Sequence, residues 1–236
     1  YFIIDFSKNN KFKKYENAHR ISIGKFGKII SLIKKRKSKK VLFAGKIAKP
    51  KFSTLRLDLK GIYYMPSLIK AAKFGDAAII KAIIKILDNE KIKVISSNFF
   101  NSELSLKVGN YTKLRPSVKD IQSIKKGVLY FNQLNSLDHV QALIVKDEKI
   151  KAVEGNRGTK KMLSKLKKKS GGILMKLPKK KQDLRMDLPT IGLNTLRDSK
   201  KYGLKGIVLK SKKNIFLDKS KCIAFANKNK IFINVI

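Results

Sequence analysis

The sequence is poor in the residue types that build several common sites. Its 236 residues include one cysteine, two histidines and no tryptophan. A lone cysteine cannot form an internal disulfide framework, and it indicates a reducing compartment. Two histidines are too few for a histidine-rich dinuclear metal site, and neither an H-E-x-x-H motif nor zinc-finger spacing of cysteine and histidine occurs. Because no run of about 18 apolar residues occurs, we expect no membrane-spanning helix.

Acidic residues are also scarce, with 16 Asp and Glu against 56 Lys and Arg and a formal net charge of +40. Such a charge usually indicates a nucleic-acid or anionic-membrane partner. Few of the basic residues are Arg, the side chain that recognises phosphates and bases bidentately, and the lysines are spread over every segment. We attribute the charge to compositional bias and expect no nucleic-acid partner. A basic nucleic-acid-binding protein remains an alternative that the charge alone motivates.

The apolar pattern predicts an α/β protein of two domains, residues 1–110 and 111–236. The 43% hydrophobic content is sufficient for a sizeable core. In the first domain we expect a helix that begins at Pro66 and a longer one over residues 76–87. No Walker A, G-x-S-x-G or complete G-x-G-x-x-G motif occurs, which removes the most easily recognised enzyme classes.

In the second domain Ser117 and Asp120 have the spacing of a capping box, which predicts a helix that runs to about residue 135. Two hairpins are predicted. Their strands are residues 140–145 with 149–153, and 207–209 with 215–217.

Residues 176–192, K-L-P-K-K-K-Q-D-L-R-M-D-L-P-T-I-G, carry the densest candidate chemistry. Polar and apolar residues alternate from 182 to 188, which predicts a half-buried strand with Asp183, Arg185 and Asp187 on one face. The same alternation is the ordinary pattern of a one-sided sheet. Two acids within five residues are nevertheless a local exception in so basic a chain.

A hard cation such as Mg²⁺ is usually held by one or two carboxylates together with substrate phosphate oxygens. On a regular strand the Cα atoms of Asp183 and Asp187 would lie about 13 Å apart, so both could bind one ion only if the strand bent. We therefore assign Asp187 the chemical role, Arg185 a phosphate contact and Asp183 an orienting role.

Several motifs occur in the order of a known family. They are I-G-K-F-G-K-I (23–29), F-A-G-K-I-A-K-P (43–50), L-R-L-D-L-K-G (55–61), A-A-K-F-G-D (71–76), A-V-E-G-N-R-G-T (152–159) and the stretch at 176–192. Together they resemble the LpxI family, the UDP-2,3-diacylglucosamine pyrophosphatases of lipid A synthesis. The resemblance covers nearly the whole chain.

This resemblance implies a cytoplasmic, Mg²⁺-dependent hydrolase that acts on a lipid-linked nucleotide sugar. Water would attack the α-phosphorus of UDP-2,3-diacylglucosamine, giving UMP and 2,3-diacylglucosamine 1-phosphate. The implied fold is a Rossmann-like N-terminal domain and a C-terminal α/β domain, with the lipid held between them. A peripheral contact with the inner membrane is also expected, helped by the lysine-rich surface. A homodimer is compatible with the resemblance.

The resemblance also implies the site residues. The aspartate that is essential to catalysis in the family corresponds to Asp187, and Asp187 and Glu154 are the implied metal ligands. The residues assigned to substrate binding are Lys176, Gln182, Thr190, Gly45, Lys46, Gln141 and Thr159. Gly45 also ends a short apolar strand, where a glycine lets a ligand approach the backbone closely.

The chain departs from the family pattern at three places. The family's first strand and glycine-rich loop would precede Tyr1, so we expect that the true N-terminus is missing. Arg157 and Lys160 stand where the family has a second Glu and an Asp after Glu154. The segment at 138–141 reads D-H-V-Q where the family has D-V-G-Q. The lost acids motivate an alternative, a non-catalytic homologue that binds a nucleotide sugar or lipid.

Overall fold

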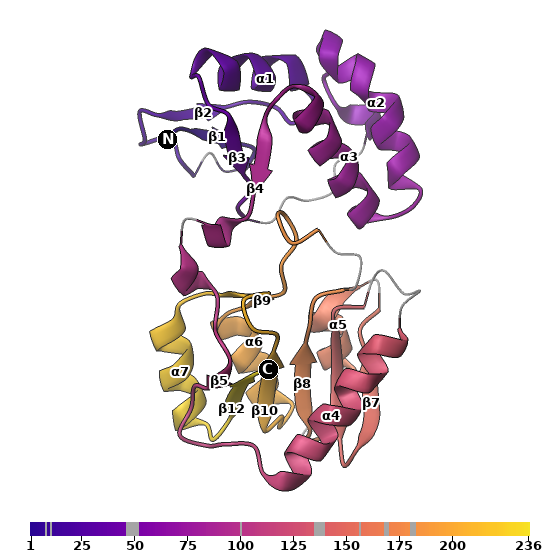
Figure 1. Cartoon of the computed structure of the whole chain (residues 1–236), viewed down its shortest axis with the longest axis vertical. Helices are drawn as coiled ribbons and strands as arrows, with labels where there is room; N and C mark the ends of the chain where they lie inside the picture. The colour runs from indigo at the N-terminus through magenta and orange to yellow at the C-terminus, as the bar shows by residue number, and fades with distance from the viewer. Residues whose placement is uncertain are drawn as a thin grey trace. The chain divides into compact units, whose positions relative to one another are not determined.

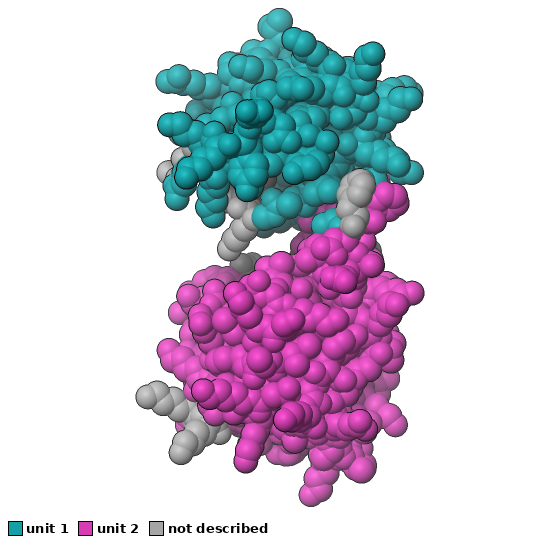
Figure 2. Space-filling model, turned by 90° about the vertical axis from the view of Figure 1, so that its left-hand side faces the viewer, with its two compact units in different colours: residues 1–97 teal, residues 98–236 magenta. Residues whose placement is uncertain are grey.

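A computed structural model describes residues 1–7, 9, 11–45, 52–99, 101–134, 140–155, 157–167, 170–179 and 183–236. The chain divides into two compact units, unit 1 (Tyr1–Ser97) and unit 2 (Asn98–Ile236), which Figure 2 shows in two colours. Both units combine helices and strands, so the prediction of a two-domain α/β protein is confirmed. The units divide between residues 97 and 98, whereas the sequence placed the boundary between 110 and 111. The structure divides the chain at a lower residue number because Leu106 already packs in the core of unit 2.

Unit 1 is built, in its described part, from two pairs of parallel strands and three helices (Figure 1). The strand pairs are β1 (Ile3–Asp5) with β2 (Ala18–Arg20), and β3 (Lys40–Leu42) with β4 (Lys93–Ile95). The helices are α1 (Phe26–Lys35), α2 (Leu59–Ala72) and α3 (Asp76–Asn89). The last two helices connect β3 to β4, as a parallel pair requires.

The start of α2 corrects one prediction. The helix begins at Leu59 rather than at Pro66, because the Asp58 carboxylate accepts the backbone N–H of Gly61 at 2.8 Å and caps it. Pro66 lies inside the helix, where it has no N–H to donate to the carbonyl four residues earlier. The preference of proline for a helix start was therefore a weaker signal than the aspartate cap.

Unit 2 is built on a six-stranded mixed sheet in the order β5–β12–β10–β8–β6–β7 (Figure 1). Its strands are β5 (Gly109–Asn110), β6 (Ala142–Lys146), β7 (Lys149–Val153), β8 (Ile173–Lys176), β10 (Gly206–Leu209) and β12 (Phe232–Val235). The three central strands β12, β10 and β8 are parallel, and β6 runs antiparallel to β8. A smaller parallel sheet pairs β9 (Thr190–Ile191) with β11 (Ile215–Phe216).

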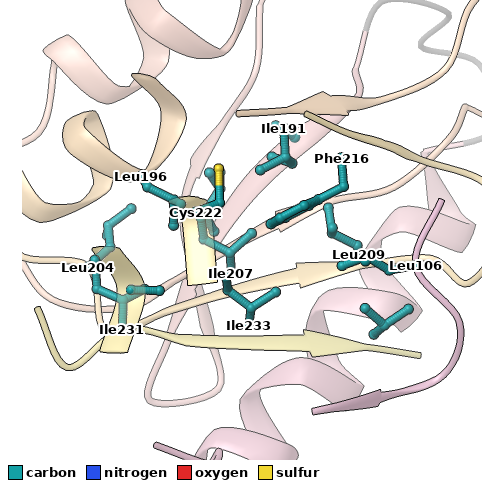
Figure 3. Close-up of a cluster of buried hydrophobic side chains, with 14 of the residues drawn as sticks. Leu106, Ile191, Leu196, Leu204, Ile207, Leu209, Phe216, Cys222, Ile231 and Ile233 are labelled. Atoms are coloured by element: carbon teal, nitrogen blue, oxygen red, sulfur yellow. The ribbon is translucent and has the colours of Figure 1, made fainter. Parts of the chain in front are cut away.

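Helices cover both faces of the large sheet. They are α4 (Val118–Gln133) on one face, and α5 (Gly158–Ser164), α6 (Leu193–Lys201) and α7 (Lys219–Lys228) on the other. Alternate residues of each strand face opposite layers: Leu143 packs in the cluster on the α4 side and Ile144 in the other. Figure 3 shows part of the second cluster, in which Ile207 and Ile233 come from neighbouring strands.

The local predictions for unit 2 were partly right. The capping box of α4 is confirmed, since Ser117 and Asp120 exchange side-chain to backbone hydrogen bonds. The hairpin of β6 and β7 is confirmed as well. The second predicted hairpin was wrong, because β10 pairs with β8 and β12 while β11 pairs with β9. Every residue of β10 is buried, which is typical of a central strand with a neighbour on each side.

No helix in the described part of the chain is long and apolar enough to cross a bilayer.

Candidate active site

Three segments meet at one edge of the unit 2 sheet. β8 ends at Lys176, β6 begins opposite it at Ala142, and β7 ends one residue before Glu154. Backbone hydrogen bonds fix this meeting point: the Leu177 N–H donates to the Gln141 carbonyl at 3.0 Å, and the Glu154 N–H donates to the Ala142 carbonyl at 2.9 Å. The edge lies at the carboxyl end of the parallel strand β8, where open α/β sheets bind their ligands.

Glu154 is 6% exposed, and two donors hold its carboxylate. One oxygen accepts the backbone N–H of Gln141 at 2.8 Å, and the other accepts the hydroxyl of Thr159 at 2.6 Å. Gly158, the first residue of α5, has a φ of 78°, a conformation that glycine adopts without a steric penalty. This turn brings the start of α5 back to the Glu154 carboxylate.

Lys176 supplies the cation of this edge. Its ammonium group donates to the Thr190 carbonyl at 3.1 Å. Burial lowers the pKa of Lys176 below its usual value, although the negative charges of Glu154 and Asp187 act in the opposite direction. One ammonium group and two carboxylates therefore lie close enough to interact.

Residues 183–188 form a turn, and the predicted strand was wrong. The Asp183 carboxylate accepts the Arg185 backbone N–H at 3.0 Å, and it also binds the guanidinium through Nε at 2.9 Å and Nη2 at 2.8 Å. The Asp187 N–H donates to the Asp183 carbonyl at 3.0 Å. Such local side-chain bonds compete with strand pairing, so the alternating pattern did not decide the structure. The 13 Å separation expected for a straight strand no longer applies.

The short strand β9 holds the Thr190 carbonyl that accepts the Lys176 bond. Its pairing with β11 starts where the Ile215 N–H donates to the Pro189 carbonyl at 2.9 Å. The Thr190 hydroxyl donates to the Leu188 carbonyl at 3.1 Å. This carbonyl could not be predicted from residue types, because the position of a backbone acceptor depends on tertiary structure.

Family models match the chain over nearly its whole length: the LpxI N-terminal domain matches residues 2–104 and the LpxI C-terminal domain matches residues 107–234. The chain belongs to the LpxI family. It is also 30% identical, over 223 residues, to a Caulobacter vibrioides protein named UDP-2,3-diacylglucosamine pyrophosphatase LpxI. That match covers 90% of this chain and 80% of the relative. The resemblance identified from the motifs is confirmed.

The LpxI motif residues of unit 2 meet at the edge described above. They are Lys176, Glu154, Asp187, Gln141, Thr159 and Thr190. Asp183 and Arg185 bind each other in the adjoining turn. Gly45 belongs to unit 1, where it has a φ of 89° beyond the end of β3. Lys46 and Gln182 lie outside the described residues, as do Asp138 and His139.

Gln141 has one feature that the motif did not reveal. Its side-chain nitrogen Nε2 is buried and has no hydrogen-bond partner among the described residues. A buried donor without a partner is costly to a folded protein, so such groups usually meet a ligand or a water. The backbone of Gln141 binds Glu154, so this residue is fixed at the same edge as the other motif residues.

Asp187 and Glu154 are the acids that interact with Lys176. In the described part of the chain, no three Asp, Glu, His or Cys side chains are placed to hold a metal ion together. Each oxygen of Glu154 already accepts a hydrogen bond, which leaves Asp187 as the better donor for a cation. This donor set fits a hard ion that takes most of its ligands from phosphate and water.

The glycine motifs of unit 1 have a structural explanation that the sequence did not give. Asp58 accepts the backbone N–H groups of Gly27 and Lys28, each at 3.0 Å, in the first turn of α1, besides capping α2 through Gly61. Burial acts to raise the pKa of Asp58, but these donors and the Lys25 charge leave it below its usual value. An aspartate thus occupies a helix N-terminus that could otherwise bind a phosphate.

Proposed function

We propose that this protein hydrolyses the pyrophosphate of UDP-2,3-diacylglucosamine to UMP and 2,3-diacylglucosamine 1-phosphate. As a member of the LpxI family the chain is a hydrolase that acts on a phosphoric anhydride, and the Caulobacter vibrioides relative is named for this substrate. The observation that carries the proposal is that hydrogen bonds bring the motif residues Glu154, Lys176 and Thr190 to one place at the end of β8, where the charge of Asp187 also acts on Lys176. The family motif thereby supplies both a cation for phosphate and an acid for water.

In the proposed reaction a water oxygen attacks the α-phosphorus, which is bonded to the uridine ribose. A new phosphorus–oxygen bond forms while the bond from the α-phosphorus to the bridging oxygen breaks. The electron pair of the broken bond stays on the bridging oxygen, which leaves as part of the sugar 1-phosphate. Negative charge grows on that oxygen, so a fixed cation beside it lowers the barrier.

We assign Lys176 to this developing charge. Its ammonium group is held by a neutral carbonyl, that of Thr190, so a phosphate oxygen can become its stronger partner. Partial burial strengthens its attraction to phosphate, because less water screens the charge. Glu154 and Asp187 favour the protonated, charged form of the lysine.

Asp187 is proposed to accept the proton that the attacking water loses. The same carboxylate would hold Mg²⁺, together with oxygens of the diphosphate and water. When bound, the ion would neutralise charge on the diphosphate. Glu154 is engaged with Gln141 and Thr159, so its proposed contribution is to hold the edge in place and to keep Lys176 charged.

Arg185 and Gln141 are proposed to bind the diphosphate oxygens. Asp183 binds two nitrogens of the Arg185 guanidinium and so orients its plane. A guanidinium has five N–H donors in a planar fork, a geometry that matches the oxygens of a phosphate. The buried Gln141 amide would gain the partner that it lacks among the described residues.

The test is the release of UMP from UDP-2,3-diacylglucosamine by the full chain in the presence of Mg²⁺. Asp187→Ala should reduce the rate by about 10²–10³-fold, as loss of one group acting in the transition state does. Asp198→Ala, a matched change of an acid on α6, should leave it unchanged. Removal of the metal with a chelator should abolish turnover.

A reaction in oxygen-labelled water decides the position of attack. Label in UMP is expected, and label in the sugar 1-phosphate would contradict attack at the α-phosphorus. The hydrolase assignment fails if the chain releases no UMP, or if Asp187→Ala releases it at the normal rate.

The second candidate function is a non-catalytic binder of the same substrate. Arg157 and Lys160, which replace two family acids, are exposed on either side of Thr159 at the start of α5. If they prevent turnover, the unaltered chain will bind substrate without cleaving it, and Arg157→Glu with Lys160→Asp will restore UMP release. Normal turnover by the unaltered chain would exclude this candidate.

A further inference from the structure

The outer face of α2 in unit 1 carries a stripe of exposed apolar residues. The helix packs against its neighbours through the buried residues Gly61, Met65 and Leu68. Helical spacing places a second apolar stripe on the opposite side. This stripe, which we call the α2 face, consists of Leu59, Ile62, Tyr63, Pro66 and Ile69, and Phe74 continues it just beyond the helix.

The side chains of the α2 face are far more exposed than is usual for residues of this kind. Leu59 is 87% exposed, Tyr63 77%, Phe74 73% and Ile62 58%. A single exposed apolar side chain needs no explanation, but a contiguous stripe indicates a surface that binds something apolar. A helix that is apolar on both sides is normally covered on both sides.

The charged residues within the α2 segment itself have one sign. Residues 59–74 include Lys60, Lys70 and Lys73 and no Asp or Glu. Lys60 forms an ion pair with Glu90. Lys70 and Lys73 are exposed, at the same end of the helix as Phe74. A partner of this face therefore has to offer apolar contact along the stripe and negative charge at the end of the helix where Lys70 and Lys73 lie.

We propose that the α2 face binds an anionic lipid surface, with α2 lying in the plane of the membrane. The apolar side chains would enter the boundary between headgroups and acyl chains, as those of interfacial amphipathic helices do. Tyr63 would keep its hydroxyl among the headgroups, while Lys70 and Lys73 would extend their ammonium groups to lipid phosphates. The proposal rests on the proposed function only in that a lipid-linked substrate lies in a membrane.

The same charges argue against a second copy of the chain as the partner. A two-fold interface sets the same surface patch against itself, so the lysines of both copies would enter one contact in which residues 59–74 offer no acid to pair with them. Each chain also carries a formal net charge of +40, which repels another copy and attracts an anionic bilayer.

The test is flotation of the full chain with lipid vesicles that contain no substrate. We expect binding to vesicles of phosphatidylcholine with added phosphatidylglycerol, weak binding to phosphatidylcholine alone, and a decrease with salt. Leu59→Ser with Tyr63→Ser should reduce binding by about tenfold or more, because two large apolar side chains are lost. Lys70→Glu with Lys73→Glu should reduce it by at least about fivefold for each lysine.

The matched control is Val118→Ser with Leu129→Ser on α4 of unit 2, two apolar residues that are similarly exposed, and it should bind as the unaltered chain does. Circular dichroism should show that all variants fold. UMP release from detergent-dispersed substrate should be unchanged in the Leu59 and Tyr63 variant, so the membrane proposal and the proposed function can fail separately.

Three results would overturn the proposal. The first is no binding to phosphatidylglycerol vesicles, and the second is equal binding by the unaltered chain and the α2 variants. The third is a dimer in sedimentation velocity that Leu59→Ser with Tyr63→Ser dissociates, which would assign the α2 face to a second copy.

Discussion

Each unit of the protein buries a glutamate near lysine, and the two arrangements differ. Glu90 in unit 1 is 9% exposed and Glu154 in unit 2 is 6% exposed. Glu90 accepts hydrogen bonds from the Lys34 ammonium at 2.6 Å, from the Lys60 ammonium and from the Tyr64 hydroxyl at 2.9 Å. The carboxylate of Glu154 instead accepts bonds from a neutral backbone N–H and a neutral hydroxyl.

The same residue types stabilise the fold around Glu90 in unit 1 and form part of the candidate site around Glu154 in unit 2. The bonds to Glu90 come from α1 and α2 and end at the last turn of α3, so this carboxylate joins three helices. Both Lys34 and Lys60 form ion pairs with this carboxylate. Lys176 donates its hydrogen bond to a neutral carbonyl, and the two acids act on it only through their charge. Its ammonium group can therefore bind a phosphate without breaking a hydrogen-bonded ion pair such as those of Glu90.

The strongest test of this contrast exchanges each lysine for methionine. Lys176→Met should reduce kcat for UMP release by about 10²–10³-fold, because no cation remains beside the leaving oxygen. Its folding stability should change little, since methionine fills the partly buried space without a charge to desolvate. The measurements are steady-state kinetics and urea unfolding of the same preparation.

Lys34→Met is the matched control in unit 1. Its kcat should be unchanged, and its stability should fall by about 0.5 kcal/mol, because the lysine is half exposed and water screens the pair. If Lys34→Met reduced kcat as strongly as Lys176→Met does, the contrast between a structural and a functional cluster would be wrong.

The sequence predicted the features that short-range hydrogen bonds determine. It missed those for which the same residue pattern fits more than one structure or more than one strand partner. The capping box at Ser117 and the hairpin at residues 142–153 follow from short-range bonds and were predicted correctly. The turn at 183–188 also depends on short-range bonds, but its alternating pattern fits a strand equally well. The partners of β10 and β11 could not be predicted, because a short apolar run does not specify its neighbours.

For the candidate site, the motifs gave the residues but not their arrangement. Asp187 was assigned a chemical role from the residues and from the family pattern, and Glu154 and Lys176 were named from the family pattern alone. The interaction of Lys176 with the two acids appears only when β7, β8 and the turn before β9 meet. The pattern gave no indication that Asp183 binds Arg185, or that the amide of Gln141 is buried without a partner among the described residues. Such facts depend on tertiary packing, which residue spacing does not encode.

The second prediction exchanges the two glutamates for glutamine. Glu90→Gln should destabilise unit 1 by about 2 kcal/mol, because two lysines lose a nearly buried charged acceptor. Glu154→Gln should cost about 1 kcal/mol at most, because its donors are neutral and an amide oxygen can still accept one of them. Its larger effect should be on kcat, through the position and charge of Lys176.

Hydrogen exchange with mass spectrometry can locate each effect. Faster exchange should appear in α2 and α3 for Glu90→Gln, and around β7 and α5 for Glu154→Gln. Equal loss of stability in both variants, with kcat unchanged in both, would show that the two glutamates have the same structural role.

The smallest expected effect is a dependence of stability on pH that belongs to Glu90. Its bonds to Lys34 and Lys60 lower the pKa of Glu90 to about 2, against a reference value of 4.5, although burial acts in the opposite direction. Because the folded state has the lower pKa, the stabilisation is fully present above about pH 4.5 and is lost as the pH falls through about 2.

Urea unfolding should therefore show a constant difference in the free energy of unfolding between the unaltered chain and Glu90→Gln at neutral pH. That difference in the free energy of unfolding should shrink steadily on acidification. The difference between the unaltered chain and Lys34→Met should be smaller throughout, because this variant removes only one of the two cations that stabilise the ionised carboxylate. A difference for Glu90→Gln that stays constant down to the acid limit would mean that Glu90 acts through packing rather than through its charge.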